Sequence, residues 1–237
     1  MASAAVTSDS ETSSSGAGAP PPPLVLSGIV KRWPGVPVVL EGVDLTLAAG
    51  SAIAIVGRNG TGKTTLLRIG VGLIAPEEGS VRLAGLDPER DRTEFQRNAG
   101  FVSAGNSGLY ARLSVRHHLD LWARLALIPR AERREATERV TSHFALEELL
   151  GRRVDRMSMG QRQRLRLALG FLHGPRVVFL DEPTTSLDDE GIALLGAAIE
   201  SLKAAGGAAI ACLPAHWEQI PGIDSAHVLV NGRLEAT

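Results

Sequence analysis

The chain has 237 residues, of which 44% are hydrophobic, and a formal net charge of −1. This length allows one substantial domain, and the lack of a basic surplus gives no reason to expect a nucleic-acid partner. The single cysteine, Cys212, excludes an intrachain disulfide and a cysteine-cluster metal site. No stretch approaches the roughly 20 uninterrupted apolar residues of a membrane helix, so we expect any contact with a membrane to go through a partner.

Residues 1–23 are rich in alanine, serine, threonine, glycine and proline. They lack the basic start and the apolar centre of a secretory signal, so we expect a disordered tail that ends in the four prolines at 20–23. Residues 24–237 are predicted to form the folded domain.

Four short apolar runs open this domain and predict a small antiparallel sheet. They lie at residues 24–26, 29–30, 36–40 and 43–47. Trp33 stands beside Pro34 and Gly35, where its indole could offer a flat face to an adenine ring. A tryptophan packed under a turn is equally consistent with these residues.

A glycine-rich loop lies between the apolar run 51–56 and a predicted helix over 64–71. Its sequence, GRNGTGKTT, fits a phosphate-binding loop, in which backbone N–H groups and a helix N-terminus surround phosphate oxygens. We expect Lys63 to contact the β- and γ-phosphates and Thr64 to ligate Mg²⁺. The predicted nucleotide-binding residues of the loop are Gly57, Arg58, Asn59, Gly60, Thr61, Gly62, Lys63, Thr64 and Thr65.

The middle of the chain, from about residue 105 to 160, predicts a mainly helical insertion that follows strands at 80–84 and 101–102. Ser114 is a good N-cap for a helix that runs to residue 127, and a charged helix is expected over 131–144. The first helix carries an apolar stripe made by Leu119, Trp122, Leu125 and Ala126. The histidines at 117, 118, 143 and 173 lack metal-site spacing, so we expect them to be solvated or packed.

Two motifs mark the second half of the sheet. Residues 157–161, MSMGQ, place a serine and a glycine at the start of a predicted helix over 162–172, which is a second anion-binding position. The apolar run 177–180 is typical of a parallel strand buried on both faces. At its carboxyl end, Asp181 is expected to hold Mg²⁺ and Glu182 to orient and deprotonate an attacking water.

A final strand is predicted over 208–213, and His216 follows it, where the imidazole could donate to the γ-phosphate. Together the motifs predict an α/β fold. Its parts are a P-loop NTPase core with a mainly parallel sheet, an N-terminal antiparallel β subdomain and an inserted helical subdomain.

In this order the motifs resemble the nucleotide-binding subunit of ATP-binding cassette (ABC) transporters, from residue 24 to the end of the chain. The resemblance identifies residues 57–65 as Walker A and 177–182 as Walker B, and it implies that Trp33 stacks on adenine and that His216 is the switch histidine. The signature motif would comprise Ser158, Met159, Gly160 and Gln161. The D-loop would comprise Ser186, Leu187 and Asp188.

The resemblance also implies a function. We expect an ATPase that uses ATP and Mg²⁺ and forms a head-to-tail dimer with an identical copy or a paralogue, in which each signature serine faces the partner's nucleotide. An integral membrane permease encoded elsewhere would dock on the helical insertion and on residues 104–110, holding the chain at the cytoplasmic face of the membrane. Residues 108–116 and 162–164 look like exporters of the ABC-2 type, which move drugs, lipids or polysaccharides.

Two positions depart from the family pattern. The glutamine expected after the strand at 101–102 is replaced by Ala104 or Gly105, and Met159 replaces the first signature glycine. A soluble ABC ATPase without transport, such as the iron–sulfur cluster assembly type, and a slow regulatory ATP-binding module remain alternatives.

Overall fold

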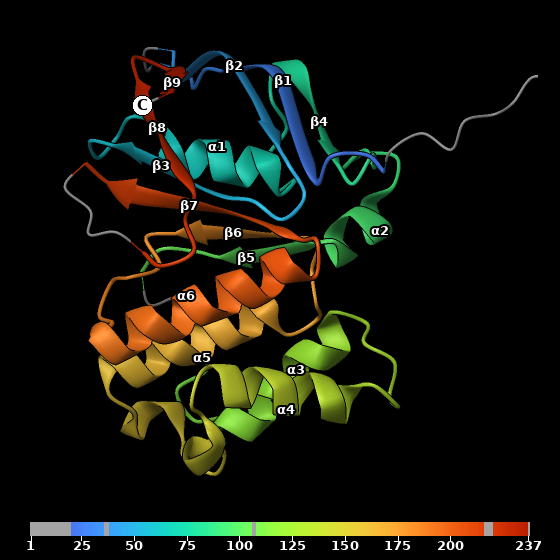
Figure 1. The fold of residues 1–237 in the computed structure, drawn as a ribbon, viewed down its shortest axis with the longest axis vertical. Helices are drawn as coiled ribbons and strands as arrows, with labels where there is room; N and C mark the ends of the chain where they lie inside the picture. The colour runs from blue at the N-terminus through green and yellow to red at the C-terminus, as the bar shows by residue number, and fades with distance from the viewer. Residues whose placement is uncertain (1–19, 36–37, 106–107, 216–219, 237) are drawn as a thin grey trace, which may run out of the picture.

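The computed structural model describes residues 20–35, 38–105, 108–215 and 220–236 (Figure 1). Its strands are β1 (Leu24–Lys31), β2 (Leu40–Leu47), β3 (Ala52–Gly57), β4 (Glu78–Leu83), β5 (Ala99–Val102), β6 (Val177–Asp181), β7 (Ala208–Pro214), β8 (Ser225–Val230) and β9 (Arg233–Ala236). Its α-helices are α1 (Lys63–Gly70), α2 (Arg92–Arg97), α3 (Val115–Leu125), α4 (Arg133–His143), α5 (Met159–Phe171) and α6 (Asp189–Ala204). Two short 3₁₀ helices, η1 (Glu147–Leu149) and η2 (Val154–Arg156), lie between α4 and α5.

The strands form two sheets. The larger has the order β5-β6-β7-β3-β8-β9, with every neighbouring pair parallel except β8 and β9. The smaller is antiparallel, with the order β2-β1-β4. The predicted α/β class with a mainly parallel sheet and a separate antiparallel sheet is therefore confirmed. Because β3 and β6 run in the same direction, the segments that leave them lie at the same edge of the sheet.

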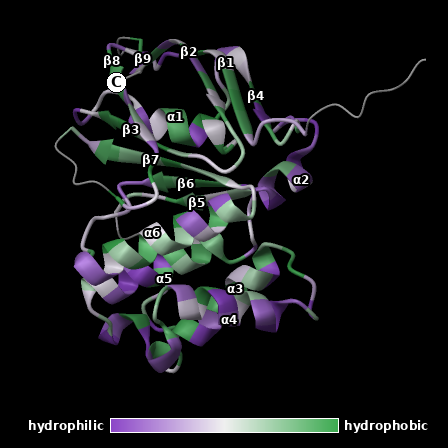
Figure 2. Cartoon of the chain, viewed as in Figure 1, coloured by the Kyte–Doolittle hydropathy of each residue, from purple (hydrophilic) through white to green (hydrophobic). Residues whose placement is uncertain are grey.

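The larger sheet has a hydrophobic core on each face, and β3 shows why. Its residues alternate: Ala52, Ala54 and Val56 pack on the side of α3 to α6, whereas Ile53 and Ile55 pack on the side of α1. Figure 1 shows α1 between the two sheets and α5 and α6 beneath the larger one. The central strands β6 and β7 are green in Figure 2, as expected for strands covered on both faces.

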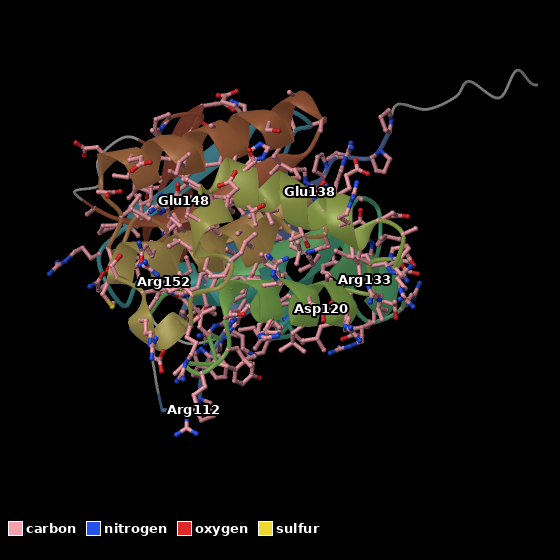
Figure 3. The ribbon with its side chains drawn as sticks, turned by 90° about the horizontal axis from the view of Figure 1, so that it is seen from below. Arg112, Asp120, Arg133, Glu138, Glu148 and Arg152 are labelled. Atoms are coloured by element: carbon pink, nitrogen blue, oxygen red, sulfur yellow. The ribbon has the colours of Figure 1, made fainter. Side chains whose placement is uncertain are left out.

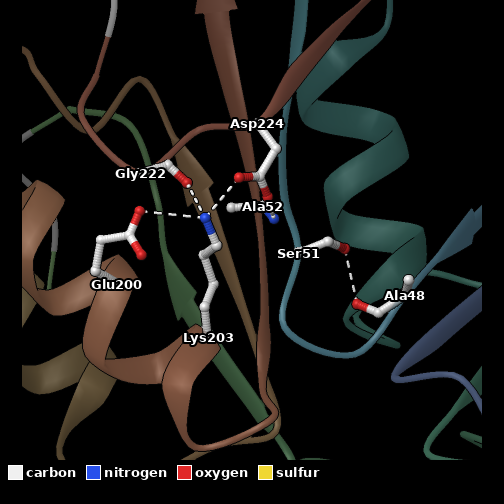
Figure 4. Close-up of polar contacts among 7 residues, drawn as sticks. All are labelled: Ala48, Ser51, Ala52, Glu200, Lys203, Gly222 and Asp224. Atoms are coloured by element: carbon white, nitrogen blue, oxygen red, sulfur yellow. Dashed lines mark hydrogen bonds and ion pairs between the residues drawn. The ribbon is translucent and has the colours of Figure 1, made fainter.

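A polar cluster ties the start of β3 to the end of α6 (Figure 4). The Lys203 ammonium donates to Asp224 Oδ1 at 2.6 Å, to the Gly222 carbonyl at 3.0 Å and to Glu200 Oε1 at 3.2 Å. Asp224 Oδ2 accepts the backbone N–H of Ala52 at 2.8 Å. Burial alone would raise the pKa of Asp224, but the bonds from Lys203 and Ala52 outweigh it and lower the pKa. The Asp224 bond raises the pKa of Lys203.

Several sequence predictions were wrong. The run 36–40 is not one strand, because β2 begins only at Leu40 and residues 36–37 lie outside the described part. Helix α2 was missed because Phe95 is its one buried residue, which leaves no apolar period to detect. The strand at 208–213 is not the last, because β8 and β9 extend the sheet beyond β3. Helix α5 begins at Met159 and not at residue 162.

The segment between β5 and α5 carries α3, α4, η1 and η2 and presents charged side chains of both signs. Figure 3 shows Asp120, Glu138 and Glu148 interspersed with Arg112, Arg133 and Arg152 on this underside. Leu125 does not belong to a buried stripe: it is 65% exposed at the last turn of α3 and lines a cavity of about 300 Å³. None of the described helices is both long and apolar enough to cross a bilayer.

Candidate functional site

The glycine-rich loop connects the end of β3 to the start of α1. Gly60 and Gly62 adopt φ values of 83° and 102°, which favour glycine. A Cβ on Gly62 would lie 2.8 Å from Val39 Cγ1, and a Cβ on Gly57 would lie 2.8 Å from the Leu229 carbonyl oxygen. The loop is thus pressed against the segment before β2 and against β8, and glycine is required at both positions.

Lys63 is the first residue of α1 and is only 6% exposed. Its ammonium donates to the carbonyls of Gly57 at 2.7 Å and Arg58 at 3.0 Å, so it lies inside the loop. Gly62 offers no side chain to cap α1, and the first turn contains no acidic residue. The positive N-terminal end of this helix is therefore not compensated by its own side chains.

The carboxylate end of β6 meets the same loop. The Thr64 hydroxyl donates to Asp181 Oδ1 at 3.2 Å, and Asp181 is 3% exposed. Glu182 follows in the left-handed region, with φ 48°, and its N–H donates to the Cys212 carbonyl at 3.0 Å. A glutamate in that region is uncommon and is held there by its surroundings. Beside these carboxylates, burial raises the pKa of the Cys212 thiol well above its usual value, as expected for a packed cysteine.

The predicted signature residues form the N-terminus of α5. The Ser158 hydroxyl accepts the N–H of Gln161, and Gln161 Oε1 accepts the N–H of Ser158, each at 3.1 Å, which makes a capping box. Met159 is 45% exposed. Among the described residues, no hydrogen bond or ion pair joins residues 158–161 to residues 57–65.

The predicted D-loop lies behind the signature. A Cβ on Gly160 would be 3.0 Å from the Ser186 carbonyl oxygen, so the two segments touch within one chain. Ser186 has φ 67°, Leu187 is partly buried, and Asp188 caps α6 by accepting the Gly191 N–H at 2.9 Å.

Trp33 is 41% exposed, and the Lys31 ammonium lies 4.8 Å from the centre of its ring. The segment that carries it leads to Val39, which contacts the glycine-rich loop.

His216 lies outside the described residues, so its predicted place beside the phosphates stays a prediction. His118 is packed: its Nε2 accepts the Tyr110 N–H at 2.8 Å, and burial lowers its pKa.

Sequence reasoning missed two buried polar side chains on α5, Gln163 and Arg166. They are 5% and 8% exposed, and Arg166 Nη1 donates to Gln163 Oε1 at 2.9 Å. The available signal was their spacing of three residues on a predicted helix. The capping box was also readable from Ser158 and Gln161 three positions later.

The family model for ABC transporters matches residues 40–185, which include the glycine-rich loop, the signature and the β6 carboxylates. The chain belongs to the ABC transporter family. The matched part is an ABC ATPase domain, and the predicted identification as an ABC ATP-binding protein is confirmed.

Two relatives and one solved structure show how far the likeness extends. The ABC transporter ATP-binding protein NatA of Bacillus subtilis is 33% identical over 161 residues, which cover 68% of this ABC chain and 65% of NatA. The cytochrome c biogenesis ATP-binding export protein CcmA of Roseobacter denitrificans is 37% identical over 203 residues, 86% of this chain and 87% of CcmA. A structure of an ABC transporter ATP-binding subunit superposes with a TM-score of 0.78 at 25% identity, covering 90% and 88% of the two chains.

Proposed function

We propose that this chain binds and hydrolyses ATP to power a separate membrane permease that exports its substrate. The bond between Thr64 and Asp181 carries the proposal, because it brings the phosphate-binding loop and the carboxylates of β6 to one edge of the sheet. That edge is where ligands bind in open parallel sheets.

The nucleotide site is assigned from the loop outward. Residues 57–65 would surround the phosphates with backbone N–H groups, and the Lys63 ammonium would exchange loop carbonyls for β- and γ-phosphate oxygens. Trp33, exposed on the segment that leads to Val39 beside the loop, would stack on adenine.

The hydroxyl of Thr64 and the carboxylate of Asp181 are two hard oxygen donors 3.2 Å apart, which fits a Mg²⁺ site. The ion would neutralise charge on the β- and γ-phosphates. Glu182, set by its unusual backbone beside Asp181, would orient the attacking water and accept its proton. His216 would donate a hydrogen bond to the γ-phosphate.

The signature needs a second cassette to act. Ser158 and Gly160 lie at a helix N-terminus that, among the described residues, has no hydrogen bond to the glycine-rich loop, so we propose that they contact the nucleotide of an identical copy or a paralogue. Met159, Gln161 and the D-loop would complete this interface. Loss of the γ-phosphate would remove those contacts and open the dimer.

The direction of transport and the partner are inferred from relatives and from the helical segment. CcmA is named an export protein, which supports export by this chain. We propose that the segment from about 105 to 160 forms a helical subdomain of the 24–237 cassette, and that it docks the permease at the cytoplasmic face of the membrane. The expected tail does not extend to residue 23, because Pro23 is buried and its carbonyl accepts the Ala84 N–H at 2.9 Å.

The position of the missing glutamine affects this coupling. Ala104 and Gly105 offer no side-chain amide to a metal or to a partner. A soluble ATPase without transport and a slow regulatory module therefore remain the alternatives to be tested.

The test compares the wild-type chain with Glu182→Gln. We expect the wild type to hydrolyse ATP in steady state and Glu182→Gln to lose roughly 100-fold in kcat while still binding ATP, because only proton acceptance is removed. Glu94→Gln, an equally conservative change on exposed α2, should keep wild-type activity. A wild-type chain that binds ATP without turnover would favour the regulatory module.

The partner is tested with the same variant. Tagged Glu182→Gln, trapped with ATP in its native cell, should recover a polytopic membrane protein in fixed ratio from detergent-solubilised membranes. Recovery of soluble proteins alone would overturn the transport function in favour of the non-transport ATPase.

A further inference from the structure

A buried chain of polar contacts crosses α5 and links the exits of two strands. Arg166 Nη2 donates to the carbonyl of Ser103, the residue directly after β5. Arg166 Nη1 donates to Gln163 Oε1 at 2.9 Å, and Gln163 Nε2 donates to the carbonyl of Pro183 at 2.8 Å. Each donor therefore has its acceptor, and this series of contacts ends at Pro183, one residue after Glu182.

The charge of Arg166 is unusual for so buried a side chain. Among the described residues no carboxylate lies within ion-pair distance of it, so carbonyl and amide oxygens are its partners. Keeping an arginine charge there costs free energy that a leucine would not. The arrangement is therefore poorly explained by stability alone.

The unusual backbone conformation of Glu182 explains why a bond from Gln163 to the neighbouring Pro183 would be useful. A glutamate at φ 48° is held only where neighbouring groups fix it. On one side its N–H is bound to Cys212 in β7. On the other side the Gln163 amide donates to the carbonyl of Pro183 at 2.8 Å, so we expect loss of that bond to loosen the backbone of Glu182.

The far end of the chain of contacts lies at a cavity. Arg166 and Ser103 line the 300 Å³ cavity together with Trp122 and Leu125, and this wall leads into residues 104–105, where the family's glutamine is missing. A group that enters the cavity would meet the same guanidinium that is tied to the Glu182 loop.

We propose that Gln163 and Arg166 are positioning residues for Glu182, which transmit the position of the segment after β5 to the catalytic carboxylate. They do this in place of the glutamine that the family pattern places at position 104 or 105. This inference rests on the proposed ATPase function.

The test is steady-state ATPase kinetics of Arg166→Ala, Arg166→Lys and Gln163→Leu. We expect kcat to fall between about 10-fold and 100-fold in the alanine and leucine variants with KM for ATP changed less than about twofold, because the carboxylate is misplaced while the phosphate loop is untouched. Arg166→Lys should recover part of kcat. Millimolar guanidinium chloride should also raise kcat of Arg166→Ala, since the vacated volume adjoins the cavity.

The matched control is Arg139→Ala, which removes another guanidinium that donates to a backbone carbonyl, that of Leu172. It should keep wild-type kcat. The double variant Arg166→Ala/Gln163→Leu should lose no more than the larger single loss, because both residues act in one series.

Wild-type kcat in both Arg166→Ala and Gln163→Leu would overturn the inference, and so would additive losses without rescue by lysine or guanidinium. If Arg166→Ala fails to fold, Arg166→Lys and Gln163→Leu decide by the same kinetics. An inactive wild-type chain would instead overturn the proposed function itself.

Discussion

Helices α1 and α5 both begin at predicted anion-binding positions, yet their first turns are built differently. Helix α1 starts after Gly62, which has no side chain to cap it, and Lys63 lies inside the loop. Helix α5 starts with a complete capping box between Ser158 and Gln161. The first terminus is open to an external anion, whereas a phosphate at the second competes with the helix's own side chains. We infer that ATP binds first at α1 and that α5 engages it only when a second cassette approaches.

Lys63→Ala should have the largest effect, a loss of ATP affinity at the N-terminus of α1. Removing a charge-assisted bond to phosphate costs about 3 kcal/mol, which is roughly 100-fold in affinity. Titration calorimetry with ATP measures it. Arg68→Ala, an exposed cation in the last turn of the same helix, should bind ATP like the wild type. Unchanged affinity in Lys63→Ala would refute the loop assignment.

Gly62→Ala should have the next largest effect. The added Cβ would meet Val39 at 2.8 Å in a left-handed backbone, so we expect a loss of about 2 kcal/mol in ATP binding, roughly 30-fold. Gly60→Ala is the control, because its φ is also positive but no atom lies within 4 Å of the new Cβ. Equal losses in the two variants would show that backbone strain, and not the contact with Val39, decides.

Ser158→Ala tests the α5 side. It removes the cap, which should cost about 1 kcal/mol of stability, and the proposed contact to the partner's nucleotide, which should lower kcat by about 10-fold. ATP affinity of the isolated chain should stay at the wild-type value. Ser114→Ala removes the equivalent cap of α3 and should reproduce the stability loss without the loss of kcat. A loss of ATP affinity in Ser158→Ala would place the signature in its own chain's site.

Asp224→Asn tests the polar cluster that ties the start of β3 to the end of α6, and it should have the smallest effect. The partly exposed pair with Lys203 contributes about 1 kcal/mol, so Tm should fall by roughly 2–4 °C. The lowered pKa of Asp224 means that its contribution is present above the usual carboxyl pKa and is lost as pH falls through the lowered value. The raised pKa of Lys203 makes its contribution disappear only in strong alkali.

Calorimetric melts from acid to neutral pH check this result. The variant should show a shallower loss of Tm in acid than the wild type. Glu200→Gln, which removes the negative charge at the longer bond to Lys203, should change Tm less. Equal acid slopes in wild type and Asp224→Asn would contradict the linkage.

The parts of the site that the sequence predicted are set by local sequence patterns or by the shared edge of a parallel sheet. The loop at 57–65 follows from glycine spacing between a strand and a helix, and the meeting of Thr64 with Asp181 follows because parallel strands end at one edge. The predicted strand 177–180 and the cap at Ser114 are confirmed for the same reason.

The parts that the sequence did not predict depend on tertiary contacts. Strand β8 pairs with β3 although 172 positions separate Ile53 from Ser225, and no local sequence pattern predicts this pairing. The contact of Arg166 with Ser103 spans 63 positions. The left-handed backbone of Glu182 was likewise invisible, because glutamate carries no preference for it.

The most direct test of the two helix termini is the structure of the Glu182→Gln chain with ATP and Mg²⁺, determined with its partner cassette. We expect Lys63 Nζ within hydrogen-bond distance of the γ-phosphate of its own nucleotide and Ser158 Oγ within that distance of the nucleotide held by the other cassette. Ser158 against its own chain's nucleotide, or a γ-phosphate out of reach of Lys63, would contradict this expectation.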